Sequence, residues 1–140
     1  MYTHGLIAPV LVLVAWTLLV WIWMYATRLP AFQKAGIAPQ DAKHPGTYAD
    51  RMPTGARQIA DNYNHLHEQP TIFYALALAL QLAGQASPMM MGLAWGYVAT
   101  RIVHSLIQNT VNIVLARFLI FALGTIVLIV MTVHGLMAVL

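Results

Sequence analysis

Two polar stretches interrupt a sequence that is otherwise dominated by apolar residues. Within each stretch the polar side chains recur every three or four residues, so on a helix they lie along one face. The first stretch contains Asp61, Asn64, His65 and Glu68, and the second contains Arg101, His104, Gln108 and Asn112. Carboxylate, imidazole and guanidinium groups inside apolar helices are costly to bury, so they indicate a binding site or a set of internal partners.

Glu68 and Arg101 carry opposite charges at a similar expected depth. If both stretches lie in helices that run antiparallel from the connection near residues 84–88, Glu68 and His104 each lie about 16 residues, or ~24 Å, below it. The Glu68 carboxylate would then face the Arg101 guanidinium. The pair has two compatible interpretations: a structural ion pair that fixes helix packing, or one wall of a polar cavity that is open to the cytoplasmic side and binds a charged ligand.

The sequence His65-Leu66-His67-Glu68 also contains side chains of the types that bind metals. On a helix, however, residues 65 and 67 point in different directions, and the sequence has no second group of closely spaced histidines. The six histidines of the chain are too few for a histidine-box membrane oxygenase. We therefore predict no metal site.

The composition argues against a water-soluble domain. Of the 140 residues, 60% are hydrophobic and only 8% are charged, whereas soluble domains carry about a quarter charged residues. So few charges cannot cover a surface in water. The chain has no cysteine, which excludes disulfides, thiolate metal sites and a cysteine nucleophile. Any sulfur chemistry would therefore need a substrate that brings its own sulfur.

Four apolar segments are each long enough to cross a bilayer, at about 20 residues per span. They cover residues 5–29, 58–84, 88–112 and 115–140. The stretch between the first two is rich in Pro and Gly and is predicted to be a loop, and Pro70 is expected to bend the second span. Short connections make neighbouring spans antiparallel. We predict an all-α, integral membrane four-helix up-down bundle formed by a single domain, residues 1–140.

Gly92 and Gly96 form a G-x-x-x-G spacing in the third predicted span. Two glycines about one helical turn apart leave a groove in which another helix can approach closely. We interpret this spacing as a packing feature, with no part in the chemistry.

The distribution of basic residues predicts the orientation in the membrane, because lysine and arginine accumulate in cytoplasmic connections. Here they lie in or beside the first connection and near the third, whereas the second connection and both termini have none. These residues are Arg28, Lys34, Lys43, Arg51, Arg57 and Arg117. We predict a cytoplasmic first connection with both termini outside, and we expect no nucleic-acid partner.

The polar stretches and their surroundings resemble the MAPEG superfamily, the membrane-associated proteins in eicosanoid and glutathione metabolism. The resemblance rests on ADNYNHLHEQPTIFYALAL, residues 60–78, and on RIVHSLIQNTVNIVLARF, residues 101–118. A Glu-x-Pro in the second span and an Arg-x-x-His in the third are typical of the bacterial branch, and here they begin at Glu68 and Arg101. The resemblance covers essentially the whole chain and implies a homotrimer of four-helix protomers.

The resemblance also implies a function. Characterised members bind glutathione near the cytoplasmic side and activate it as a thiolate, which reacts with lipophilic electrophiles or lipid hydroperoxides. The implied glutathione-binding residues are Arg57, Asn64, His65, Glu68, Arg101 and His104, and the implied catalytic residues are Gln108 and Arg117. His65 stands where those enzymes usually have Asn, and Gln108 stands where many have Tyr. On this basis we expect a transferase or peroxidase of the bacterial inner membrane that uses glutathione as cosubstrate.

A second hypothesis belongs to another class, a non-catalytic trimeric membrane protein that binds anionic lipid or a membrane partner. Three basic residues at the cytoplasmic face, Arg51, Arg57 and Arg117, would bind a lipid phosphate as well as a carboxylate. Bound glutathione would favour the first hypothesis, and phospholipid co-purified beside Arg117 would favour the second.

Overall fold

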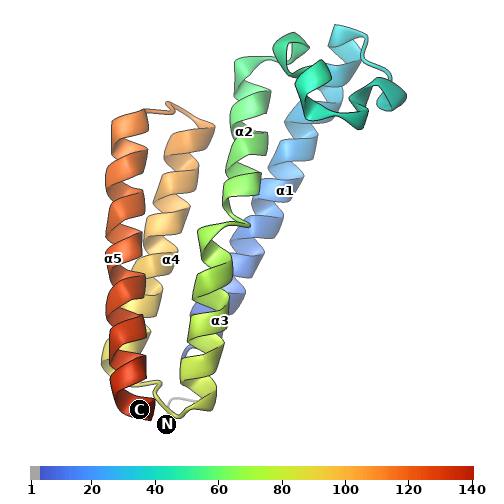
Figure 1. Ribbon diagram of the computed structural model, residues 1–140. Helices are drawn as coiled ribbons and strands as arrows, with labels where there is room; N and C mark the ends of the chain where they lie inside the picture. Colours follow the sequence, from blue (N-terminus) through green and yellow to red (C-terminus); the bar gives the residue numbers. More distant parts are fainter. Residues whose placement is uncertain (1–3) are drawn as a thin grey trace.

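The chain folds into long antiparallel helices, as its apolar segments predict (Figure 1). The structure is a computed structural model and describes residues 4–140. Its α-helices are α1 (Ile7–Ala35), α2 (Thr54–His65), α3 (Gln69–Leu82), α4 (Pro88–Asn109) and α5 (Val114–Val139), and short 3₁₀ helices lie at Pro39–Lys43, Pro45–Thr47 and Ala49–Arg51. α2 and α3 are two parts of one pass, so the described chain makes four passes. The predicted four-helix up-down bundle is confirmed.

The two ends of the bundle differ in what they carry. The start of α1, the C-terminus and the α3–α4 connection lie together at one end, which we call the terminal end (Figure 1). The α1–α2 connection, residues 36–53, and the α4–α5 connection, residues 110–113, lie at the other end, which we call the basic end. The side of the membrane that each end faces stays a prediction.

α1 is longer than the sequence predicts. The loop was expected to begin after residue 29, but the helix continues through Pro30 and stops at Gly36, whose positive φ of 65° closes it with a bond from its N–H to the carbonyl of Gln33. The added turns are held by packing, because Ala31 belongs to a small apolar cluster with Tyr48 and Met52 of the connection. Tertiary contacts therefore outweigh the poor helix propensity of proline here.

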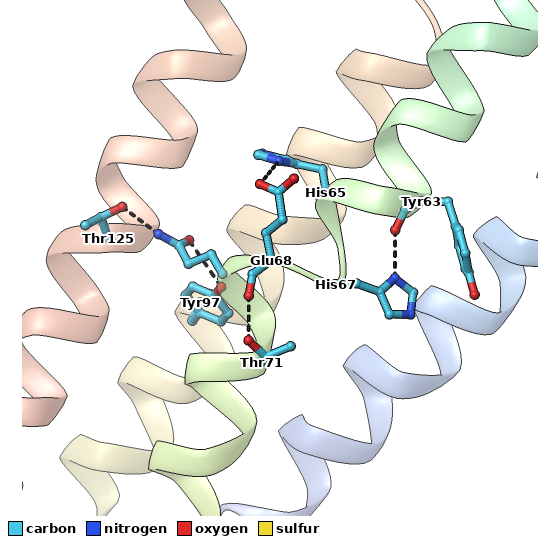
Figure 2. A network of polar contacts seen from close by, with 8 residues as sticks. Tyr63, His65, His67, Glu68, Thr71, Tyr97 and Thr125 are labelled. Atoms are coloured by element: carbon cyan, nitrogen blue, oxygen red, sulfur yellow. Dashed lines mark hydrogen bonds and ion pairs between the residues drawn. The ribbon is translucent and has the colours of Figure 1, made fainter. Parts of the chain in front are cut away.

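The second pass is broken, whereas the sequence predicts one continuous span over residues 58–84. Proline has no N–H to donate and its ring clashes with the carbonyl four residues earlier, so Pro70 disturbs the helix at Leu66. The regular helix accordingly ends at His65 and resumes at Gln69, and Glu68 between them has a non-helical backbone (φ −92°, ψ −96°). The bend expected at Pro70 is confirmed, as a full break in the helix (Figure 2).

The last two passes lie close to their predicted bounds. α4 begins at Pro88 as expected, and the Ser87 hydroxyl accepts a bond from the amide of Met90 at 3.3 Å. It ends at Asn109, three residues early, and the chain turns at Asn112, which has a positive φ of 49° that asparagine tolerates better than most residues. α5 begins one residue before the predicted position.

The part of the bundle toward the terminal end is filled by apolar side chains. The buried members of this core are Leu6, Val10, Leu13, Phe73, Ala77, Leu80, Met90, Ala94, Tyr97, Val98, Leu128 and Met131. The rings of Phe73 and Tyr97 stack with their centroids 4.6 Å apart. The Tyr97 hydroxyl donates to Gln69 at 3.2 Å, and the Gln69 amide donates to Thr125 at 2.8 Å, so one short chain of bonds joins α3, α4 and α5 (Figure 2).

Glycines of α5 allow close contact with neighbouring helices. A Cβ added at Gly124 would lie 3.0 Å from the Thr100 hydroxyl and 3.5 Å from the Tyr97 ring of α4. The G-x-x-x-G glycines of α4 behave differently, because a Cβ at Gly92 or Gly96 would meet nothing within 4 Å in the described chain. The two glycines therefore make no close helix contact within the described part of one chain.

Large apolar side chains also cover the outside of the bundle. On α5, Leu119, Leu123 and Ile126 are each more than half exposed. Both α1 and α5 are long and apolar enough to cross a membrane, and only 28% and 17% of their apolar stretches are buried. A core helix of a soluble protein would be mostly buried, so these surfaces fit contact with lipid.

The close approach of α5 to α4 yields a test. Gly124→Val is expected to destabilise the protein by about 1 to 3 kcal/mol, because the added methyls overlap Thr100 and Tyr97. The control is Ala138→Val, which introduces the same residue at an exposed position of the same helix. Thermal unfolding in detergent measures both. Equal melting midpoints for the two variants would contradict the packing.

Candidate functional site

The polar residues of the third predicted span lie buried on the inward face of α4, toward the basic end. Arg101, His104, Ser105, Gln108 and Asn109 are all buried, as is Asn62 on the facing helix α2. The same helix contributes Met90, Ala94 and Tyr97 to the apolar core, so α4 changes from apolar to polar along one face. Each of these six side chains has at least one nitrogen or oxygen atom without a hydrogen-bond partner in the described part of the chain.

The guanidinium of Arg101 is the most costly of these groups. The residue is 1% exposed, and none of its three side-chain nitrogens has a hydrogen-bond partner among residues 4–140. Its guanidinium carbon lies 5.8 Å from the ring centroid of Phe121, a weak favourable contact. A buried charge without an acceptor is strongly unfavourable, so this position calls for an anion that the described chain does not supply.

The predicted contact between Glu68 and Arg101 is not formed. The Glu68 side chain is 67% exposed, and its Oε2 lies 3.2 Å from Nδ1 of His65, the one ion pair that the described residues contain (Figure 2). The physical reason is the break in the second pass: the depth estimate assumed a continuous helix, whereas Glu68 lies in the non-helical link before α3. The carboxylate therefore partners a residue one turn away along the chain.

The His65 ring lies between two other rings. Its centroid is 4.9 Å from that of His104 on α4 and 5.6 Å from that of Phe121 on α5. Glu68 holds His65 from the other direction through Nδ1. His67 points elsewhere, as predicted, and its Nδ1 bonds the carbonyl of Tyr63 (Figure 2).

These rings border a cavity of about 230 Å³ between α2, α4 and α5. We call it the imidazole cavity, and its lining residues are His65, His104, Val114, Arg117, Phe118 and Phe121. Arg117 is anchored because its Nη1 donates to the side-chain oxygen of Asn112. Its Nε, and Nδ1 of His104, are buried without a partner in the described chain. The lining contains no carboxylate, so the cavity is suited to an anion.

The predicted site residues divide between two places. His65, His104 and Arg117 line the imidazole cavity, and Arg101 lies behind its Phe121 wall. Arg57 and Asn64 instead line a separate cavity of about 180 Å³ at the basic end, beside Arg28 and Tyr48. Gln108 is buried one turn beyond His104 and is not part of the imidazole cavity lining.

Two residues that shape this region are not among those predicted from the sequence. Phe121 separates Arg101 from the cavity, and Asn62 is fully buried on α2. Phe121 lies in a continuous apolar run that gives no signal of which face turns inward. Asn62 did carry a signal, since it lies in the polar part of the second pass, three residues before His65.

The unpaired charge of Arg101 yields a test. Arg101→Met is expected to raise the melting midpoint of the ligand-free protein, because it removes a buried charge that has no acceptor and keeps a side chain of similar length. Arg57→Met, at an exposed position, is the control and should change the stability by less than about 0.5 kcal/mol. A large fall in the midpoint of Arg101→Met would contradict the prediction and show that Arg101 has an acceptor outside the described chain.

Comparison with protein-family models identifies the family of this chain. Searches of curated proteins and of solved structures gave no match. The model of the MAPEG family matches residues 6–137, which is nearly the whole chain and includes both polar stretches. The two long apolar helices α1 and α5 agree with a membrane protein, and this match establishes that the chain belongs to the MAPEG family of helical membrane proteins.

Proposed function

We propose that this protein is a membrane enzyme that activates the thiol of glutathione in the imidazole cavity and transfers its sulfur to a lipophilic electrophile. The observation that carries the proposal is the imidazole cavity itself, into which three helices bring His65, His104 and Arg117 with no carboxylate in the lining. Membership of the MAPEG family supports glutathione as the cosubstrate. The absence of cysteine fits a reaction whose sulfur arrives with a substrate.

The charges around the cavity match those of glutathione. The peptide carries two carboxylates and one ammonium group, and it gains a third negative charge when its thiol ionises. Arg117 supplies the positive charge for the carboxylates or the thiolate, and Arg101, which does not line the cavity, adds to the positive potential without contacting the ligand. The exposed Glu68 has one oxygen on His65 and a second oxygen left for the ammonium group.

The Glu68–His65 pair offers a route for the thiol proton. With Nδ1 donating to Glu68, Nε2 of His65 is the free acceptor, which is the usual arrangement of a base held by an orienting carboxylate. In our proposal the thiol proton moves to Nε2, and the thiolate is held by the Arg117 guanidinium. Gln108, predicted from the resemblance as catalytic, has no direct part in this scheme because it lies outside the cavity lining.

The sulfur then reacts with the second substrate. The thiolate electron pair forms a carbon–sulfur bond. In a substitution the leaving group departs with the electron pair of the bond that breaks, and in an addition the π pair of an activated double bond moves to the neighbouring atom and takes up a proton. With a lipid hydroperoxide as the second substrate, two glutathione molecules supply two electrons and the products are an alcohol, water and glutathione disulfide. Phe118 lines the cavity and is 63% exposed, so one wall reaches the outer surface of α5.

We further propose that the working form is a homotrimer in which a neighbouring copy completes the site. Glu68 is two-thirds exposed although it lies in the interior of the second pass. A carboxylate facing hydrocarbon is costly, so a neighbouring protein surface over it is the favourable arrangement. The free G-x-x-x-G face of α4 is a second surface on which a helix of another copy can pack.

Glutathione binding tests the proposal directly. Calorimetric titration of the detergent-purified protein is expected to show saturable binding. Arg117→Gln should weaken that binding by about tenfold to a hundredfold, because charge-assisted hydrogen bonds are lost. Glu68→Gln should also weaken it through the ammonium group.

The matched control for this titration is Arg57→Gln, since Arg57 lines the other cavity. Equal loss of binding in Arg57→Gln and Arg117→Gln would place the ligand outside the imidazole cavity. A flat titration of the unaltered protein would contradict glutathione as the cosubstrate and favour the non-catalytic lipid- or partner-binding protein.

The role of His65 as base is tested separately. His65→Gln should bind glutathione within a few-fold of the unaltered protein but lower kcat by about 10² to 10⁴-fold, because the proton acceptor is lost. The ultraviolet absorbance measures how much bound glutathione is present as thiolate, and the conjugation rate gives kcat. His67→Gln, a neighbour that points away from the cavity, is the control. An unchanged kcat in His65→Gln would rule out this role.

A further inference from the structure

A third cavity, of about 360 Å³, lies at the basic end between α1, the start of α2 and the end of α4. It shares no lining residue with the imidazole cavity. Most of its wall is apolar, with Pro30 and Ala31 of α1 and Ile59 of α2. Three polar features also meet there, from three different parts of the chain.

The first feature is Asn109, the last residue of α4. It lines the cavity and is 8% exposed, yet neither its amide nitrogen nor its carbonyl oxygen has a hydrogen-bond partner in residues 4–140. A buried amide that makes no hydrogen bond is unfavourable. This side chain is therefore positioned to bond a polar ligand in the cavity.

The second feature is the uncapped beginning of α2. The first amides of a helix have no carbonyl of a preceding turn to bond, and they carry a partial positive charge. Here the cap position is Pro53, no side chain of the described residues caps the helix, and the first turn contains no acidic residue. Pro53, Gly55 and Ala56 line the cavity, and a Cβ at Gly55 would meet nothing within 4 Å, so a ligand can approach these amides.

The third feature is the ammonium group of Lys34, which comes from the last turn of α1 and also lines the cavity. A lysine, a helix N-terminus and an amide donor together favour an oxyanion. The apolar wall along α1 and α2 favours a ligand that also has hydrocarbon chains. Asp41 and Asp50, the two acidic residues of the nearby connection, do not line the cavity.

We propose that this cavity binds the phosphate group of a membrane phospholipid, with the phosphate at the start of α2 and beside Lys34. Asn109 bonds the ester region, and one acyl chain follows the apolar wall of α1 past Pro30. The site goes beyond the proposed enzymatic function and does not depend on it. It also differs from the lipid contact beside Arg117 that the sequence suggests, because Arg117 lines the imidazole cavity.

The test uses the full-length chain purified in detergent. Phosphatidylglycerol is added and the melting midpoint and the bound lipid are measured, the latter by native mass spectrometry. Phosphatidylglycerol should bind and raise the midpoint, whereas diacylglycerol, which has the chains without the phosphate, should do neither. Lys34→Gln should weaken phosphatidylglycerol binding by about fivefold, and Lys43→Gln, a lysine outside the cavity, should not change it.

Gly55→Glu is the stronger variant, because it places a carboxylate where the phosphate would lie. An acidic residue in the first turn favours a helix, so this variant should fold, and a lipid-free midpoint no lower than that of the unaltered protein checks that it does. Its phosphatidylglycerol binding should fall further than that of Lys34→Gln. Binding that is unchanged in both variants overturns the proposal. Equal stabilisation by inorganic phosphate, with displacement of the lipid, overturns the lipid assignment in favour of free phosphate.

Discussion

The burial of the Arg101 guanidinium is the constraint on which the rest of the structure depends. A charge that is 1% exposed and has no acceptor in the described chain costs several kcal/mol, and the neighbouring buried amides and imidazole add to that cost. The stability must therefore come from elsewhere in the bundle. The apolar core toward the terminal end supplies it, and Tyr97, one helical turn from Arg101, marks the boundary between the two regions.

The break between α2 and α3 has a second consequence beside the loss of the expected ion pair. A continuous helix would make all its backbone hydrogen bonds, and Glu68 would lie on the same helical face as His65. Glu68 bonds Nδ1 of His65, whose ring is tilted against that of His104 with the two centroids 4.9 Å apart. Gln69 resumes the helix and bonds Tyr97 and Thr125, so the kink is fixed against α4 and α5 rather than left free to bend. Pro70 thus breaks the second pass directly beside the Glu68–His65 pair.

The sequence predicts the passes well and the contacts between them less well. Length and apolar content place α4 and α5 within three residues of their observed ends, because a bilayer imposes a minimum span. The end of α1 was predicted too early, at Pro30, because the packing of Ala31 on Tyr48 and Met52 is a tertiary contact that local sequence rules do not include. The pairing of Glu68 with Arg101 failed for a related reason: depth along a helix is counted correctly only when the helix is unbroken.

The same limit applies to Phe121 and to the shape of the site. α5 is apolar apart from Arg117 and a few scattered polar residues, so its apolar residues give no periodicity from which an inward face could be read. The structure shows that α5 contributes Phe118 and Phe121 to the cavity while most of its outer side chains are exposed. Under the proposed function this arrangement has a physical advantage. A lipophilic reactant dissolved in the membrane would meet the thiolate across the α5 wall without passing through water, whereas the peptide would enter through the polar region beside Glu68.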